Sequence, residues 1–229
     1  MTNTKQITKT VLLALAFLGV VVGVERALKY ATDPVVLGSH TRDKEPVTVT
    51  LGDVRLSIPK NKIRFEDQRQ DGVQGRIDLY LSWPALDGYA KDNERVFNDT
   101  SEAGSLIFLS LVAEQSAGTP ERRLNEIYRR FFVGKPWKGP SGLIGQELDP
   151  KSGYAGENVF YARDTDGVFV TRCLQAEAAV KNKLQPTCLF DFELVPGLIA
   201  HVRFHELILH DWRDINRRIA LMLTSMRLP

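Results

Sequence analysis

The chain has 229 residues, of which 43% are hydrophobic and 25% charged, and these proportions are typical of a globular protein rather than a disordered one. Lys5 and Lys9 account for the formal charge of +2, and the sequence after them carries 28 basic and 28 acidic residues. Nucleic-acid-binding proteins usually have a clear basic excess, so we expect no nucleic acid among the partners.

An apolar segment near the N-terminus indicates where the protein resides. Val11 to Val24 is a run of 14 apolar or small residues that follows the two lysines. This pattern is typical of an uncleaved signal anchor or a cleaved signal peptide, and a hydrophobic helix inside a soluble fold is a third alternative. Because no Ala-x-Ala cleavage site follows the run, the anchor is favoured.

We therefore expect a single-pass protein of the inner membrane. Residues 1–9 would lie in the cytoplasm, residues 10–24 would form the transmembrane signal anchor (or signal peptide), residues 25–45 would be a linker, and residues 46–229 would form an extracytoplasmic, periplasmic globular domain. The N-terminal helix makes the cell membrane one expected partner.

The first part of the domain predicts strands. Val47 to Leu51 and Val54 to Ile58 alternate around Gly52-Asp53, which predicts a two-residue hairpin turn. Gln74 to Trp83 alternates strictly, so we expect one buried and one partly wet face. Leu106 to Ala113 is apolar on both faces, which predicts a strand covered on both sides. Pro84 to Gly104 between them is a long polar connection.

A helix and a glycine-rich segment follow. Thr119-Pro120 predicts a helix start with Thr119 as N-cap, and the helix is expected to bury Leu124, Ile127, Tyr128 and Phe131 and to stop at Gly134. From Gly134 to Glu157 the glycine content predicts an adaptable loop surface. Residues 159–163 and 168–174 then predict a second hairpin.

The C-terminal part carries the clearest pattern. Cys188 to Leu194 and Leu198 to Phe204 alternate around a Pro196-Gly197 turn, which predicts two antiparallel strands. A closing amphipathic helix starts at Asp211, its expected N-cap, with Asp214 and Arg218 as an i,i+4 pair. The fold class expected is α+β, with a mainly antiparallel sheet of about six to eight strands and two main helices, preceded by the N-terminal membrane helix.

Two cysteines occur in neighbouring predicted strands. Cys173 and Cys188 are 15 residues apart, so a disulfide between them would close the loop that joins the strands. The alternative is a pair of buried free thiols. A metal or redox site is not expected because no Cys-x-x-Cys spacing is present.

Catalytic and cofactor motifs are weak. His201 and His205 lie about 13 Å apart on an extended strand, too far to share one metal ion. Gly139-Pro140-Ser141-Gly142 matches neither a P-loop nor a nucleophile elbow. We therefore expect no cofactor, no metal site and no identifiable catalytic residue.

Two classes of function remain. The favoured one is a non-catalytic protein that binds an envelope protein or cell-envelope partner, such as an assembly factor, inhibitor or immunity-type protein. Exposed aromatic residues often anchor such interfaces, so Trp137, Tyr154 and Tyr89 are the candidate contacts. The alternative for Trp137 is that its side chain fills a loop. The other class is a cell-envelope hydrolase whose site cannot be identified from the sequence. The oligomeric state is left open.

Overall fold

The computed structural model describes residues 40–99, 103–114, 118–164 and 167–229. They belong to one unit, His40–Pro229. The expected cytoplasmic N-terminus, the signal anchor and most of the linker lie outside the described residues. Within the described ranges, no helix has both the length and the apolar character needed to cross a bilayer.

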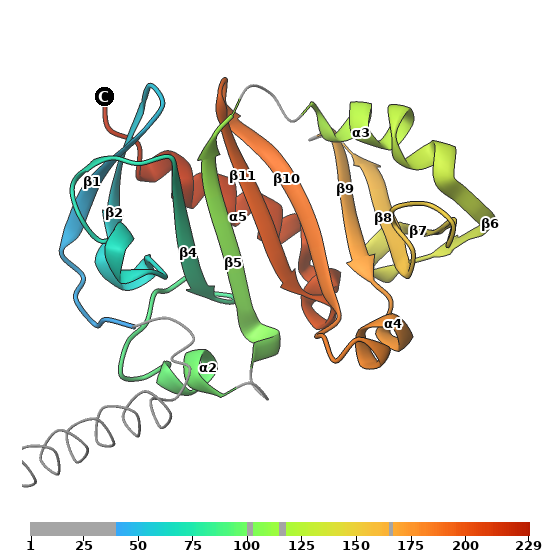
Figure 1. The fold of residues 1–229 in the computed structure, drawn as a ribbon, viewed down its shortest axis with the longest axis horizontal. Coiled ribbons are helices and arrows are strands. Elements are labelled where there is room, and N and C mark those ends of the chain that lie inside the picture. The colour runs from blue at the N-terminus through green and yellow to red at the C-terminus, as the bar shows by residue number, and fades with distance from the viewer. Residues whose placement is uncertain (1–39, 100–102, 115–117, 165–166) are drawn as a thin grey trace, which may run out of the picture. The chain divides into compact units, whose positions relative to one another are not determined.

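Eight strands form one antiparallel sheet, which confirms the expected class of fold (Figure 1). Their order across the sheet is β4-β5-β11-β10-β9-β8-β7-β6. The strands are β4 (Arg76–Ser82), β5 (Leu106–Ala113), β6 (Phe132–Lys138), β7 (Ile144–Leu148), β8 (Glu157–Asp164), β9 (Gly167–Leu174), β10 (Thr187–Val195) and β11 (Leu198–His205).

A separate sheet of three strands has the order β2-β1-β3. It contains β1 (Pro46–Leu51), β2 (Val54–Pro59) and β3 (Gly72–Val73), and β3 runs parallel to β1. The hairpin predicted around Gly52-Asp53 is present. Gly52 has a φ of 57°, a left-handed conformation that favours glycine at this turn.

Four α-helices are present in the described residues, against the two main helices expected. They are α2 (Glu94–Asn98), α3 (Pro120–Glu126), α4 (Ala176–Lys181) and α5 (Trp212–Ser225). Short 3-10 turns connect the elements: η1 (Lys60–Lys62), η2 (Glu66–Gln68), η3 (Ala103–Ser105), η4 (Tyr128–Phe131), η5 (Pro140–Gly142) and η6 (Glu206–Asp211).

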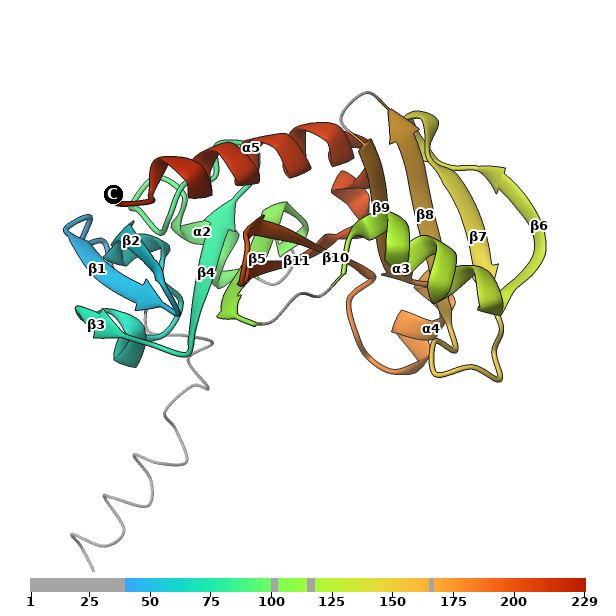
Figure 2. The same ribbon diagram turned by 90° about the horizontal axis from the view of Figure 1, so that it is seen from above.

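Helix α5 covers one face of the large sheet (Figure 2). Its residues Ile215, Ile219 and Leu223 are fully buried and belong to the same core as Val202 and Phe204 of β11. The amphipathic pattern of the closing sequence thus predicted the helix and its buried side.

The details of the α5 N-terminus differ from the expectation. Asp211 precedes the helix but makes no side-chain capping bond, because it accepts a hydrogen bond from Trp83 Nε1 at 2.9 Å. Asp214 pairs with Arg217, one residue before the expected Arg218. Arg218 instead donates to the carbonyl oxygen of Pro84 at 2.6 Å. Both arginines therefore have partners that sequence spacing alone did not identify.

Helix α3 lies on the opposite face of the sheet from α5. In β9, Val170 belongs to the cluster around Leu124 of α3, while the preceding residue Phe169 stacks on Trp212 of α5 with ring centroids 4.7 Å apart. Successive residues of a strand point to opposite faces, so the two helices cover opposite sides of β9. Figure 2 shows them on the two sides of the sheet.

The predicted α3 is shorter than the sequence pattern suggested. Thr119 caps it as expected, since its hydroxyl accepts from the Arg122 amide at 3.2 Å. The helix ends at Glu126, and the chain continues as the 3-10 turn η4. Ile127 falls at this junction and is 38% exposed rather than buried.

Three further expectations about strands were wrong. The segment from Gly134 to Glu157 contains most of β6 and all of β7 instead of a single loop. Strand β4 is buried on both faces after Arg76, whereas one wet face was expected, because the chain between β2 and β4 folds over it. Strand β5 shows the reverse: Phe108 and Ser110 are only half-buried.

The two halves of the large sheet are joined weakly at β9 and β10. These strands pair at only two positions, Cys173 with Cys188 and Arg172 with Leu189. The disulfide favoured by the sequence is present between Cys173 and Cys188. Beyond it the strands separate (Figure 1), and the rings of Phe169 and Phe190 pack against each other with centroids 5.3 Å apart. The covalent link therefore lies where the hydrogen-bonded ladder is shortest.

Candidate functional site

On the side that points away from α5, strands β4, β5, β11 and β10 are only partly covered. Strand β4 is buried there and its Tyr80 packs on Phe97 of α2, whereas β5, β11 and β10 keep half-buried or exposed side chains. We call the side of these strands that points away from α5 the open face (Figures 1 and 2). Successive residues of a strand point to opposite faces, so the residues between the core positions of these strands form the open face. In β11, for example, His201 and Arg203 alternate with the buried Ala200, Val202 and Phe204.

One row of side chains across the open face is polar. The strand registers place Asp78 opposite Ser110, Ser110 opposite His201, and His201 opposite Asp191. Four neighbouring strands thus contribute one titratable or hydroxyl group each. We call this set the polar row.

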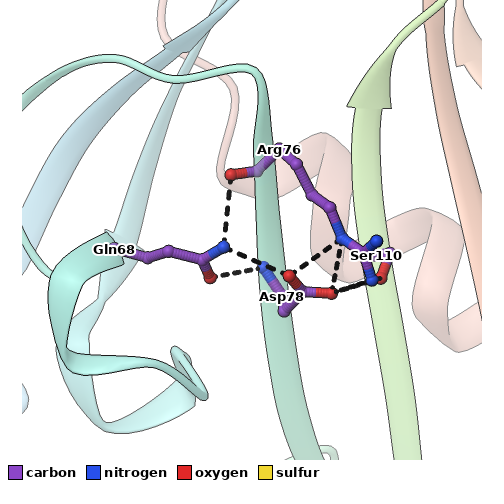
Figure 3. A network of polar contacts seen from close by, with 4 residues as sticks. All are labelled: Gln68, Arg76, Asp78 and Ser110. Atoms are coloured by element: carbon purple, nitrogen blue, oxygen red, sulfur yellow. Dashed lines mark hydrogen bonds and ion pairs between the residues drawn. The ribbon is translucent and has the colours of Figure 1, made fainter.

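The Asp78 end of the polar row is a closed hydrogen-bond network (Figure 3). Arg76 donates to the Asp78 carboxylate at 2.6 Å and to Ser110 Oγ at 2.8 Å. Ser110 Oγ itself donates to Asp78, and Gln68 of η2 donates to the same carboxylate at 3.1 Å. Burial alone would raise the pKa of Asp78, but these hydrogen bonds lower it. Asp78 is therefore an anion held in place by hydrogen bonds from Gln68, Arg76 and Ser110.

The other end of the polar row contains a second ion-paired group. Asp191 Oδ1 lies 2.7 Å from His201 Nδ1, and its other oxygen accepts from Arg123 of α3. Burial would raise the pKa of Asp191, but His201 and Arg123 together lower it. The hydrogen bond to Asp191 raises the pKa of His201, with help from Glu114, whose carboxylate lies 3.8 Å from Nε2. This cluster favours a protonated His201.

The next row along the strands is amphipathic. Tyr80 lies opposite Phe108, Phe108 opposite Arg203, and Arg203 opposite Leu189. Tyr80 is buried, Phe108 is half-buried and Arg203 is exposed. Leu189 is 37% exposed, an unusual position for a leucine in an inner strand. We call these four residues the amphipathic row.

Arg64 lies over the amphipathic row from the segment that follows η1. Its guanidinium carbon is 4.7 Å from the centroid of Tyr80 and 5.6 Å from that of Phe108, and that of Arg203 is 4.5 Å from Phe108. These are cation–π distances. Neither guanidinium makes a hydrogen bond or ion pair with any other described residue, and Arg64 Nε is buried without a partner.

Two pockets lie on the open face. One, of about 290 Å³, is lined by both rows and includes Arg64, Asp78, Ser110, His201 and Arg203. The other, also about 290 Å³, lies toward α3 and is lined by residues that include Arg123, Arg172, Leu189 and His201. Because His201 and Leu189 line both, the two pockets form neighbouring parts of one surface.

The polar row resembles a serine hydrolase triad in composition but not in connectivity. A triad requires the nucleophilic hydroxyl to donate to the histidine that is oriented by the carboxylate. Here Asp191 orients His201, but the Ser110 hydroxyl donates to Asp78 on the other side. Asp78 is an ion-paired carboxylate rather than a base poised near neutral pH. The Ser110 hydroxyl therefore has a structural hydrogen bond and is not activated as a nucleophile.

The three aromatic residues proposed from the sequence as partner contacts do not lie together. Trp137 is on the edge strand β6 and packs edge to face on Phe160, with its ring directly over Gly145. Tyr154 packs on Tyr128 under α3, and Tyr89 stacks on His40 with centroids 4.8 Å apart. Each therefore belongs to a different part of the molecule.

Of these three, Tyr154 is the one linked to the open face. Its ring lies 4.9 Å from the guanidinium of Arg172, which pairs in register with Leu189 and makes an ion pair with Glu157. The residues that form the open face were not proposed from the sequence. The alternation that placed His201 and Arg203 on a wet strand face was the available signal.

Metal binding finds no support in the part of the chain that the structure describes. No group of three histidine, cysteine, aspartate or glutamate side chains there is arranged to hold an ion. His201 is paired with Asp191, and His205 accepts a hydrogen bond from the amide of Leu207.

Comparison with known proteins adds a likeness of fold. No family model and no curated protein sequence matches this chain. Its structure is similar to that of Smlt3025, an immunity protein of the type IV secretion system of Stenotrophomonas maltophilia, with a TM-score of 0.58 and 14% identity over 83% of this chain and 96% of that one. It is also similar to FrpD, an iron-regulated outer membrane lipoprotein of Neisseria meningitidis, with a TM-score of 0.46 and 11% identity over 82% of this chain and 95% of that one. The likeness to Smlt3025 shows a shared fold.

Proposed function

We propose that this protein is a non-catalytic, membrane-anchored binding protein of the cell envelope whose open face binds a partner protein in the periplasm. The apolar segment over residues 10–24 supports the anchor, and the disulfide supports an oxidising compartment. The fold shared with Smlt3025 supports an immunity-type role, in which the bound partner would be a toxic or secreted protein.

The observation that carries this proposal is the open face itself. A sheet face that is only partly covered and is not simply polar normally requires a reason, because antiparallel sheets that face water on one side carry simple polar side chains there. This face instead presents arginine, aromatic and leucine side chains beside an ion-paired row. Arginine is, with tryptophan and tyrosine, among the residues enriched in the binding hot spots of protein interfaces.

Photo-crosslinking at two matched leucines tests the proposal. Leu189 on the open face is 37% exposed and Leu221 on α5 is 62% exposed, so both are accessible and they lie on opposite sides of the sheet. A benzoyl-phenylalanine would replace one or the other in the full chain, in intact membranes. The proposal predicts a specific protein adduct from position 189 and none from position 221.

Equal adducts from both positions, or an adduct from position 221 alone, would contradict it. The same experiment with the probe at Trp137, Tyr154 or Tyr89 examines the contacts proposed from the sequence. Tyr154 is the strongest of the three because Arg172 connects it to Leu189. We expect an adduct at position 154 and a weaker one, or none, at positions 137 and 89.

A hydrolase is the second candidate, and the row of Ser110, His201 and Asp191 is the observation in its favour. The hydrogen bond from Ser110 to Asp78 is the observation against it. A fluorophosphonate probe labels activated serines. Labelling of the wild type that is lost in Ser110→Ala would establish the hydrolase, whereas we expect no labelling of Ser110.

A further inference from the structure

The strongest unexplained feature of the open face is a pair of arginines without an acidic partner. The face also contains Arg76, Arg123 and Arg172, and each of these has its own carboxylate: Asp78, Asp191 and Glu157. These ion pairs cancel in charge. The guanidinium groups of Arg64 and Arg203 remain, held around one phenylalanine ring, with no acid bound to either among the described residues.

The surroundings of this pair favour an incoming anion. Arg64 Nε is buried and donates to no described residue, and a buried donor left unsatisfied raises the free energy of the folded state. Burial raises the pKa of Tyr80 although the charges of Arg64 and Arg203 oppose this, so the ring beneath them is a neutral phenol. Tyr80 therefore does not neutralise the positive charge of the two guanidinium groups.

The geometry also restricts the kind of anion. Cation–π contacts with Tyr80 and Phe108 hold the two guanidinium groups over the rings, and a planar guanidinium fork binds a carboxylate through two parallel hydrogen bonds. Leu189 lies opposite Arg203 in the adjacent strand and is partly exposed. A free inorganic anion has nothing to place against this leucine, whereas a polypeptide that carries an acidic side chain beside an apolar one does.

We propose that Arg64 and Arg203 form the recognition site for an aspartate or glutamate side chain of the partner protein, with Leu189 contacting an apolar neighbour of that acid. This inference rests on the proposed function and specifies it: the partner presents an acidic and apolar segment to the amphipathic row. Arg203 is the outer, exposed member of the pair, and Arg64 is the inner one with the unsatisfied nitrogen.

The test uses the full chain in membranes with benzoyl-phenylalanine at position 189, combined with a second substitution. In Arg203→Glu the acid of the partner meets a like charge, and the yield of the protein adduct should fall by about tenfold or more, since breaking a desolvated charge pair weakens binding by at least that factor. Arg203→Lys keeps the charge but not the planar fork, so we expect an intermediate yield.

Arg55→Glu is the matched control because Arg55 is an exposed strand arginine in the other sheet. Its adduct yield should equal that of the wild type. Thermal melting of Arg203→Glu, followed by circular dichroism, establishes that the variant is folded. Mass spectrometry of the adduct should then identify a partner peptide that contains Asp or Glu, and changing that acid to Lys should restore crosslinking to Arg203→Glu.

The alternative outcomes are distinct. A protein adduct whose yield Arg203→Glu leaves unchanged overturns this inference and leaves the proposed function standing. The absence of any protein adduct at position 189 overturns both. An adduct with a phospholipid would assign the arginines to a membrane headgroup, and an adduct with a second copy of this chain would make the face a dimer interface; either result overturns the inference.

Discussion

The two faces of strands β4, β5, β11 and β10 are built from alternate residues of the same segments, yet they differ in kind. On the α5 side, Val202 and Phe204 are fully buried in a continuous apolar core. On the open side, His201 and Arg203 of the same strand meet charges and solvent. The chain completes the packing of one face by itself, and the other face keeps charged and aromatic groups that are partly exposed. Apolar packing is thus concentrated on one side, and the other side is the one that we propose for binding.

The largest loss of stability should come from a substitution that disrupts packing on the covered face. Phe204→Ala removes a side chain that is fully buried beneath α5, so the free energy of unfolding should fall by about 3–5 kcal/mol. Arg203→Ala, one residue away on the open face, should change it by about 0.5 kcal/mol or less. Urea denaturation of the full chain in non-ionic detergent, followed by tryptophan fluorescence, measures both. Similar losses for the two variants would mean that both faces are equally important for folding.

The second effect concerns the join between the two halves of the sheet. Replacing Cys173 and Cys188 by alanine together should lower the free energy of unfolding by about 3 kcal/mol, as expected for a loop closed over a separation of 15 residues. The two strands share only this short ladder, so few hydrogen bonds compensate for the lost bond. Reduction of the wild type by dithiothreitol should reproduce the loss, and it should have no effect on the double variant. A wild type insensitive to reduction would show that the ladder alone is sufficient.

Substitution of Asp78 on the open face should have an intermediate effect on the free energy of unfolding. Asp78→Asn removes the charge that holds Arg76, Ser110 and Gln68 together, so we expect a loss of about 1–3 kcal/mol at neutral pH. Because the folded pKa of Asp78 is lowered, its stabilising effect is present above the unfolded pKa of about 3.9 and disappears as the pH falls through the folded value. The wild-type advantage over Asp78→Asn should therefore shrink in acid. An advantage that is constant down to about pH 2 would be inconsistent with this account.

The smallest effect should be the pH dependence due to His201. Its pKa is raised above the ordinary 6.5 by the hydrogen bond to Asp191, so the protonated form is the stabilised one. That contribution is complete below the unfolded pKa and is lost as the pH rises through the folded value. Relative to His201→Gln, the melting temperature of the wild type should therefore decline between about pH 6 and pH 8. NMR titration of the imidazole gives the pKa directly, and Asp191→Asn should lower it.

The sequence predicted the covered face well because burial leaves a regular pattern. Alternation identified β10 and β11, and the amphipathic repeat identified α5 with its buried residues Ile215 and Ile219. The same alternation placed His201 and Arg203 on a wet face. It could not reveal which strands are neighbours, and only the strand order brings Asp78 and Ser110 into one row with His201.

Strands β6 and β7 were missed for a physical reason. Gly145 in β7 lies beneath the ring of Trp137, where a Cβ atom would come within 2.3 Å of the indole, so glycine is needed there for packing and not for flexibility. Pro136 in β6 is tolerated because β6 is an edge strand and its pairing with β7 is irregular at that point. Glycine and proline usually indicate a loop, but here they are residues of two paired strands.

The central claim is that the open face, and not the α5 side, binds a protein partner. The most direct measurement is quantitative mass spectrometry of envelope proteins that copurify with the tagged full chain, compared among the wild type, Leu189→Asp and Leu221→Asp. Both variants add one negative charge at an exposed leucine, one on each side of the sheet. The account predicts that a partner is lost with Leu189→Asp and retained with Leu221→Asp. Retention with Leu189→Asp, or loss only with Leu221→Asp, would contradict it.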